Sequence, residues 1–416
     1  MQLLKRFGVE AHESRLSNGM KVFLFKRKGM PISLDVSFFA GSRFDETPGT
    51  AHFLEHMLVA GTEKFPSKNL ISDYLMEVGG DFGASTGNDT LKISIDIPEA
   101  IDLHRGIEVL NEMLANSIMS DKSLETERGS IFSEIADRKS HPGSYLWEVM
   151  RRLSLQGTDA AKSTLGTAES VKLINKKGLL KHKERYINTG RGVFVASGDI
   201  GMNRLCAQLE KISLPSSDRF QALKKLPIIR EKIVDVEKYP GVEQLQVVLA
   251  NRIDIENYRE DCSLRILLSI LGEGRGSRLI TKLRYEKGLV YGISGSCMTA
   301  PDWDDFYVRL SCDKNNFESS KQAIAEVFEN LRKNNITKEE FNRSKSALVK
   351  GAIPSFQTSY SWVRFHVYDA LFEPDDMETP EDFIQEVSNL TLDDIKHVID
   401  KFLKPEEFYT AICGDY

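Results

Sequence analysis

Two histidines and a glutamate stand close together between Thr50 and Thr62, where their side chains have the right types to hold a metal ion. His52, Glu55 and His56 follow the pattern H-x-x-E-H. No Gly or Pro interrupts the stretch before Gly61, so we expect a helix. Residues three and four apart lie on one face of a helix, and both imidazoles and the carboxylate would then project together. The alternative is an ordinary amphipathic helix that carries these residues on its polar face.

A hydrolytic metal site needs a further ligand. Zinc that takes part in hydrolysis keeps three protein ligands and one position for water, and a neighbouring Glu serves as general base. The order H-x-x-E-H is the inverzincin signature, the reverse of the commoner H-E-x-x-H. Within an expected helix at 121–139, Glu127 and Glu134 lie two helical turns apart and share a face. Taken alone, these two glutamates would be read as solvated surface acids.

The elements that must position these residues are predicted from hydrophobic periodicity. Alternating or β-branched stretches predict strands at 20–26, 32–39 and 91–97, and an apolar run predicts a buried strand at 192–199. Helical spacing predicts helices at 67–78, 99–119, 170–186 and 203–212. On the helix at 99–119, the side chains expected to face the core are Ile101, Ile107, Leu110, Leu114 and Ile118. The first half therefore reads as a mixed sheet with helices grouped around it.

Length and composition favour a soluble protein of two domains. The chain has 416 residues, 41% of them hydrophobic and 28% charged, with a net charge of -6. This balance gives no electrostatic case for binding nucleic acid or an anionic membrane, and no apolar run is long enough to span one. The N-terminus resembles neither a secretory signal nor a transit peptide, so we expect the mature protein to start here, in a cytoplasm. Five widely spaced cysteines are expected to be reduced and mostly buried.

The second half of the chain repeats the first. A compositional break at 213–232 suggests an inter-domain linker, which predicts domains at 1–213 and 233–416. The strand expected at 408–415 echoes 193–199 at an offset of 216 residues. The same offset carries the three metal-motif residues onto Leu268, Leu271 and Gly272, in or beside an apolar helix at 264–271 that follows a strand at 245–250. The second copy is therefore expected to keep the scaffold without the ligands.

Together, the pattern H-x-x-E-H and the later E-R-x-x-I-x-x-E at 127–134 resemble the pitrilysin and mitochondrial-processing-peptidase family of zinc inverzincins. The resemblance implies an α+β fold with two duplicated domains, each a mostly antiparallel sheet with helices packed around it. It implies His52, His56 and Glu134 as Zn²⁺ ligands, Glu55 as general base, and Glu127 as an outer acid that orients a ligand. The chain departs from the family at Gly83, where relatives usually carry Asn.

A segment of the second half, residues 274–296, is similar to the family pattern S-R-L-x-x-x-L-R-x-x-K-G-L-x-Y. The resemblance implies that Arg284 and Tyr291 bind and orient substrate, with the Tyr291 hydroxyl placed to donate to an oxyanion. Without it, the segment reads as a helix ending at Gly288, with Arg284 solvated and Tyr291 packed at the start of a strand.

Three smaller expectations complete the sequence-based picture. Thr337 and Thr391 each begin a capping box that opens a helix. His366 lies in an aromatic run and is expected to be a core or interface residue rather than a ligand. The remaining histidines have no ligand spacing and receive no role.

The activity that the resemblance implies is zinc-dependent endopeptidase cleavage of short or unfolded polypeptides inside a dimeric chamber. A homodimer is expected, in which Arg284 and Tyr291 of one copy serve the zinc of the other. Two alternatives remain open: a non-catalytic subunit, and an active subunit of a heterodimeric processing peptidase that depends on its partner.

Overall fold

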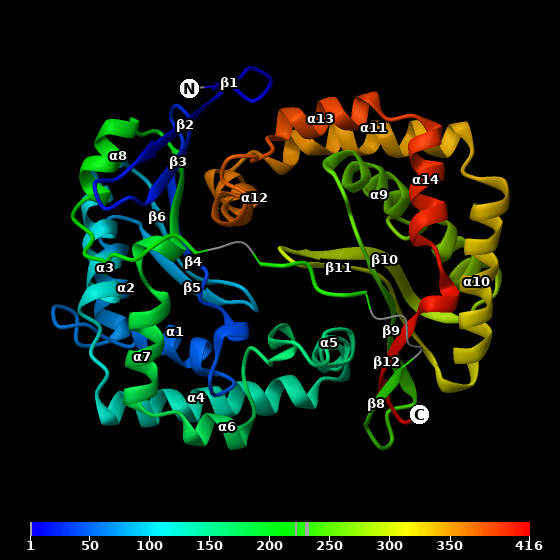
Figure 1. Cartoon of the computed structure of the whole chain (residues 1–416), viewed down its shortest axis with the longest axis horizontal. Coiled ribbons are helices and arrows are strands. Elements are labelled where there is room, and N and C mark those ends of the chain that lie inside the picture. Colours follow the sequence, from blue (N-terminus) through cyan, green and yellow to red (C-terminus); the bar gives the residue numbers. More distant parts are fainter. Residues whose placement is uncertain (1, 221–222, 229–232) are drawn as a thin grey trace. The chain divides into compact units, whose positions relative to one another are not determined.

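The computed structural model describes residues 2–220, 223–228 and 233–416, and these form two compact units (Figure 1). Unit 1 comprises 2–136, 162–220 and 353–379, whereas unit 2 comprises 137–161, 223–228, 233–352 and 380–416. Unit 1 therefore includes residues 353–379 from beyond the predicted linker, and unit 2 includes residues 137–161 from before it. In each case the helix of that segment packs on the sheet of its unit. The division at 213 and 233 stays a prediction about the sequence repeat.

The sheet of unit 1 has the strand order β1-β2-β3-β7-β4-β6-β5. β3 and β7 pair in parallel and the other neighbours are antiparallel. The bounds are β1 Gln2–Leu4, β2 Val9–Arg15, β3 Lys21–Lys26, β4 Ile32–Phe38, β5 Asp81–Thr86, β6 Leu91–Ile97 and β7 Gly192–Gly198. The four strands predicted in this half are confirmed as β3, β4, β6 and β7, and three further strands were not predicted.

Helices surround this sheet (Figure 1). Their bounds are α1 Thr50–Val59, α2 Lys68–Met76, α3 Leu103–Ala115, α4 Asp121–Ser140, α6 Ala168–Leu173, α7 Lys176–Tyr186, α8 Met202–Leu209 and α12 Ser359–Phe372, with short 3₁₀ turns η1 Ser42–Phe44, η2 Ala100–Asp102 and η4 Thr189–Arg191. The helix predicted at 170–186 is two helices, because the Asn175 side chain accepts a hydrogen bond from the Gly178 N–H and starts α7 anew.

The helix predicted at 99–119 is shorter than its periodicity suggested. Ile101 lies in η2 and is 66% exposed, and Ile118 lies beyond the last residue of α3 and is 39% exposed. Both predictions of inward-facing side chains were wrong, because neither residue belongs to the regular helix whose spacing was extrapolated. The other three, Ile107, Leu110 and Leu114, are buried as expected.

The two faces of the unit 1 sheet are covered differently. Leu34, Val36 and Phe38 of β4 face the main core with α1 and α3. The opposite face of β3, β7 and β4 packs against α12, where Trp362 and His366 are fully buried. The His366 ring stacks on Phe25 with centroids 3.8 Å apart, which confirms its core role.

The sheet of unit 2 has the order β10-β11-β9-β12-β8. Its strands are β8 Val234–Lys238, β9 Gln244–Ile253, β10 Val290–Ala300, β11 Trp303–Asp313 and β12 Tyr409–Gly414. The helices are α5 Pro142–Ser154, α9 Tyr258–Leu271, a π-helix η5 Ile280–Glu286, α10 Phe317–Asn334, α11 Lys338–Ser355, α13 Pro380–Asn389 and α14 Leu392–Phe402, with short turns η3 Asp159–Ala161, η6 Lys314–Asn316 and η7 Pro405–Glu407.

The duplication is visible in the topology. The run β3-β7-β4-β6-β5 of unit 1 matches β8-β12-β9-β11-β10 of unit 2, and in both runs the first pair is parallel and the rest antiparallel. The predicted α+β fold with two duplicated domains is therefore confirmed. Leu268 and Leu271 are buried in α9 and Gly272 ends that helix, so these positions offer no ligand.

Three other sequence-based expectations are tested by the structure. Both predicted capping boxes form, because Thr337 and Glu340 exchange hydrogen bonds, as do Thr391 and Asp394. All five cysteines are free, and three of them are buried. No helix among the described residues is long and apolar enough to cross a membrane.

Candidate metal centre

The two histidines of α1 and one glutamate of α4 converge on a common point in unit 1. His52 Nε2 lies 3.5 Å from one Glu134 carboxylate oxygen, and His56 Nε2 lies 3.5 Å from the other. One ligand atom from each residue lies within 4.8 Å of the other two, and no other such group of His, Cys, Asp or Glu occurs in the described part of the chain. Two imidazole nitrogens and one carboxylate oxygen form the donor set of a catalytic zinc site with three protein ligands.

Glu127 contacts the ring nitrogen of His56 that does not face Glu134. Its Oε2 lies 2.9 Å from His56 Nδ1. Because a carboxylate can only accept, Nδ1 carries the hydrogen and Nε2 is left with a lone pair that points toward Glu134. An outer carboxylate of this kind fixes the tautomer and orientation of a ligating imidazole. This contact is the one that the orienting role of Glu127 requires, and the role itself stays a prediction.

Glu55 lies on the same helix and is fixed by a residue that the sequence analysis did not single out. The Thr86 hydroxyl, at the end of β5, donates to Glu55 Oε2 at 2.7 Å. Burial raises the pKa of Glu55, and the Thr86 hydrogen bond and the charge of His56 oppose part of that shift. A carboxylate with a raised pKa is a stronger base. No local signal marks Thr86, because the contact joins two elements far apart in sequence.

The start of α1 is fixed by Asp45, which the sequence analysis also missed. The Asp45 carboxylate accepts hydrogen bonds from the backbone N–H groups of Gly49 (2.8 Å) and Ala51 (2.9 Å). Burial raises the pKa of Asp45 to about 7. Gly49 has φ +94°, and a Cβ there would lie 2.7 Å from the Leu165 carbonyl oxygen. These contacts set the first turn of α1, two residues before His52.

The rotation of α4 about its axis is fixed by Arg128, between the two glutamates. Its guanidinium donates to the carbonyls of Val171 and Ile174, the latter at 2.9 Å, and lies over the Phe53 ring of α1 at 5.2 Å. Ile131 is fully buried one turn further along the helix. Arg128 is the second letter of E-R-x-x-I-x-x-E, so a signal existed, but its role required the distant carbonyls.

Arg284 and Tyr291 belong to unit 2, whereas His52, Glu55, His56, Glu127 and Glu134 belong to unit 1. Arg284 is exposed on η5 and forms no ion pair with any described residue. Tyr291 is 68% exposed and lies where the β10–β11 register shifts, between Val290 and Gly292. Tyr291 is thus a bulge residue directed outward rather than packed. Their roles toward substrate stay predictions.

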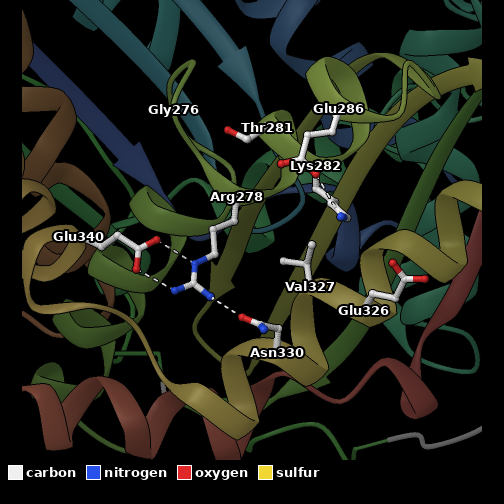
Figure 2. A pocket seen from close by; sticks show the side chains of 9 residues that line it. All are labelled: Gly276, Arg278, Thr281, Lys282, Glu286, Glu326, Val327, Asn330 and Glu340. Atoms are coloured by element: carbon white, nitrogen blue, oxygen red, sulfur yellow. Dashed lines mark hydrogen bonds and ion pairs between the residues drawn. The ribbon is translucent and has the colours of Figure 1, made fainter.

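The helix that carries Arg284 is anchored beside a hollow of about 500 Å³ in unit 2 (Figure 2). Figure 2 shows Arg278 directed at Glu340 and Asn330, and its Nε and Nη2 donate to the Glu340 carboxylate at 2.8 and 2.7 Å. This pair lowers the pKa of Glu340 to about 2. Lys282 is likewise paired with Glu286 at 3.0 Å. The Arg278 contacts hold the start of this segment against α11 and α10, the Lys282–Glu286 pair lies within η5, and together the pairs neutralise the Arg278 and Lys282 charges of the hollow.

Two family models match the chain. Residues 28–168 match the model described as insulinase (peptidase family M16), which covers all five converging residues. Residues 174–348 match the model described as peptidase M16 inactive domain, which covers Arg284 and Tyr291. The second description agrees with the lack of a ligand cluster among the described residues of unit 2.

Curated and solved proteins give the same picture. The chain is 24% identical over 408 residues to an uncharacterized zinc protease of Rickettsia felis, covering 93% of this chain and 94% of that protein. It is 28% identical over 209 residues to the mitochondrial-processing peptidase subunit beta of Dictyostelium discoideum, covering 49% of this chain and 43% of that one. A crystal structure of a peptidase M16 inactive domain from Pseudomonas fluorescens has the same fold, with a TM-score of 0.89 at 20% identity and 98% of each chain covered.

Proposed function

Because this chain belongs to peptidase family M16, we propose that it is a zinc endopeptidase that hydrolyses peptide bonds in short or unfolded polypeptides. The observation that carries the proposal is the convergence of His52, His56 and Glu134 next to Glu55. A non-catalytic subunit would have no use for this set, since one buried imidazole, one half-buried imidazole and a half-buried Glu contribute little to the core.

Each residue of the site has its own role in hydrolysis. His52, His56 and Glu134 hold the metal, and Glu127 keeps the His56 ring turned toward it. Zinc, when bound, supplies a Lewis acid that polarises the scissile carbonyl and makes water more acidic. Glu55 takes a proton from the attacking water and later gives it to the leaving amine. The Thr86 hydroxyl limits the rotation of the Glu55 carboxylate.

Arg284 and Tyr291 complete the proposal as groups that contact the substrate. Both are exposed and unpaired among the described residues, so their donors are available to a peptide. We assign the Tyr291 hydroxyl to the developing oxyanion and Arg284 to a substrate carbonyl or carboxylate. We expect a homodimer in which these two residues serve the metal of the other copy.

One observation favours a second candidate, a catalytic subunit that needs a different partner chain. A relative that covers about half of this chain is named as the beta subunit of a processing peptidase. In that case the chain alone would bind zinc but would not cleave peptides.

The decisive experiment uses the purified full chain, zinc analysis, size measurement and a quenched fluorescent peptide. We expect one zinc per chain, a dimer, and turnover that a chelator abolishes. Glu55→Gln should lower kcat by about 10³-fold or more with zinc still bound. Glu63→Gln, an exposed glutamate just beyond α1, serves as the matched control and should keep full activity. Inactivity with zinc bound would favour the missing partner, and absence of zinc would overturn the proposal.

A further inference from the structure

The guanidinium of Arg278 connects three segments of unit 2. Its Nε and Nη2 donate to the carboxylate of Glu340, in the first turn of α11, at 2.8 and 2.7 Å. Toward the end of α10, its Nη1 donates to the Asn330 side chain at 3.2 Å and its Nη2 to the Asn335 carbonyl at 3.3 Å. The two side chains of the ion pair are only 19% and 17% exposed. Arg278 comes two residues before η5, so contacts of fixed direction hold the start of that helix.

Glu340 is itself held by the start of its own helix. Its Oε2 accepts a hydrogen bond from the Thr337 N–H at 2.8 Å, and its own N–H donates to the Thr337 hydroxyl at 3.1 Å. These reciprocal contacts form a capping box. The hydrogen bonds from Arg278 lower the pKa of Glu340 to about 2, so the pair stays ionised at all pH values above about 3. It is therefore a permanent anchor and not a pH-dependent one.

The other contacts of η5 do not fix its orientation. Leu279 and Leu283 are fully buried and hold one side of the segment against the core of unit 2. Burial of apolar surface has no preferred direction, so it keeps the helix attached without fixing its rotation. On another side, the hollow of about 500 Å³ opens between Thr281 and Lys282 of η5 and Val327 of α10 (Figure 2). Close packing is incomplete there and cannot replace the ion pair.

Arg284 lies on the exposed part of η5, six residues after Arg278. A π-helix is rare and is frequently found at functional sites. A small rotation of this helix would displace the Arg284 guanidinium, and a displacement of about 1 Å in the positioning of a substrate can lower the rate about 100-fold. Tyr291 is held differently, because it lies on β10, which pairs along its length with β11. The two residues proposed to contact substrate therefore depend on different anchors.

We propose that Arg278, held by Glu340, is a positioning residue for Arg284, and that the pair sets the affinity of the enzyme for its peptide substrate. The inference rests on the proposed endopeptidase activity and on the substrate contact assigned there to Arg284. Glu55 and the metal ligands belong to unit 1 and make no use of this anchor. Loss of the ion pair should therefore raise KM and leave kcat nearly unchanged.

Unit 2 contains a second ion pair of the same design, which provides a matched control. Asp394 of α14 accepts hydrogen bonds from Nε and Nη2 of Arg259, both at 2.8 Å, and from the Thr391 N–H at 2.7 Å. It takes the same place in the capping box of α14 that Glu340 takes in that of α11. Asp394→Asn thus removes an equivalent pair, between α9 and α14, and leaves every contact of Arg278 in place.

The test measures kcat and KM of the zinc-loaded full chain with a quenched fluorescent peptide, together with the Tm of each variant. We expect Glu340→Gln to raise KM about tenfold and to change kcat by less than about twofold. Asp394→Asn should lower the Tm about as much as Glu340→Gln does, but keep the wild-type KM. A wild-type KM in Glu340→Gln, or an equal rise of KM in both variants, would overturn the proposal.

Two double variants separate positioning of Arg284 from a general loosening of unit 2. In an Arg284→Met background, Glu340→Gln should no longer change kcat/KM, because the side chain that the pair positions is gone. In a Tyr291→Phe background, the effect of Glu340→Gln should persist in full. The opposite result in either background would mean that the ion pair acts through a group other than Arg284.

Failure of the proposed function gives a different result, because then the zinc-loaded wild-type chain cleaves no peptide. In that event, fluorescence anisotropy with the same peptide, labelled at one end, still tests the anchor. Weaker binding by Glu340→Gln but not by Asp394→Asn supports it. Equal affinities, or no binding by any of the three proteins, overturn it.

Discussion

The two units share a five-stranded run of sheet and a clamp, a contact in which a cation on one helix binds the carbonyl just before the cap of another, yet among the described residues only unit 1 has a cluster of metal ligands. In unit 1, Arg128 of α4 donates to the carbonyl of Ile174, the residue before the Asn175 cap of α7. In unit 2, Lys345 of α11 donates at 3.0 Å to the carbonyl of Leu390, the residue before the Thr391 cap of α14. The two cations thus perform the same structural task.

The residues near Arg128 in unit 1 differ from those near Lys345 in unit 2 at the positions of the metal site. If Arg128 is matched with Lys345, the buried Leu124 is matched with the buried Phe341. Glu127 and Glu134 then correspond to Ser344 and Gly351. At the offset of 216 residues, His52, Glu55 and His56 correspond to Leu268 and Leu271 of α9 and to Gly272 at its end. The scaffold therefore does not depend on the ligands. In unit 1 they occupy positions that the fold alone could fill with small or apolar residues.

The largest effect is expected when a metal ligand of unit 1 is replaced by the residue type found at the matching position of unit 2. His52→Leu should abolish zinc binding and lower activity by about 10⁴-fold or more. The free energy of unfolding of the metal-free protein should stay unchanged or rise, because a largely buried imidazole is replaced by an apolar side chain. Zinc analysis and urea unfolding with chelator measure both results. His104→Leu, at an exposed position, is the control, and zinc retained by His52→Leu would show that the ligand assignment is wrong.

The metal motif could be predicted from sequence because its information is local. His52, Glu55 and His56 share a face through helical spacing alone, and Glu127 and Glu134 do so on a second helix. That the two helices meet was supplied by the family resemblance rather than by the spacing. The groups that hold them, Asp45, Thr86 and Arg128, act through distant backbone and side-chain contacts. No single-residue pattern encodes such contacts.

The fold was predictable where one face of an element is buried. β4 and β6 alternate clearly and were found, whereas β5, with the sequence DFGAST, is half-exposed and contains Gly, so it gave no signal. The positions of α5 and α12 could not be predicted either. An amphipathic helix reveals that it has an apolar face but not which sheet will cover that face.

A smaller effect is expected when the outer acid is removed. Glu127→Gln should weaken zinc binding by about 10- to 100-fold, because His56 Nδ1 loses its charged partner and the ring is less well oriented. Competition with a chromogenic chelator measures the change. Asp121→Asn at the first turn of the same helix removes one charge without touching His56 and should leave zinc affinity unchanged. Equal losses in the two variants would contradict the orienting role.

Removing the clamps tests whether the two units differ only in their ligands. Arg128→Met and Lys345→Met should each lower the free energy of unfolding by about 1–3 kcal/mol, since each leaves a carbonyl without its charged donor. Only Arg128→Met should also weaken zinc binding, because Glu127 and Glu134 lie on its helix. If Lys345→Met weakens zinc binding equally, the clamps are not independent and the comparison fails.

The helices that cover the two sheets differ in one ionisable residue, so we expect their contributions to the free energy of unfolding to respond differently to acid. In unit 2, α5 covers β12 with the apolar residues Leu146, Val149 and Met150. In unit 1, α12 buries His366, and burial lowers its pKa to about 4. Between pH 6.5 and 4 the unfolded chain binds a proton on this histidine that the folded chain does not. The stabilisation present above pH 6.5 is therefore lost as the pH falls toward 4, by up to about 3 kcal/mol.

Replacing that histidine should remove this part of the pH dependence. In His366→Leu, measured without metal, the fall in the free energy of unfolding between pH 7 and pH 4.5 should be about 2 kcal/mol smaller than in the wild type. The variant also loses the Nδ1 contact with the Trp362 carbonyl at 2.8 Å, so its stability at pH 7 will differ, and only the change with pH is diagnostic. His104→Leu, at an exposed position, is the control and should keep the wild-type slope. An unchanged slope in His366→Leu would mean that the acid sensitivity arises elsewhere in the fold.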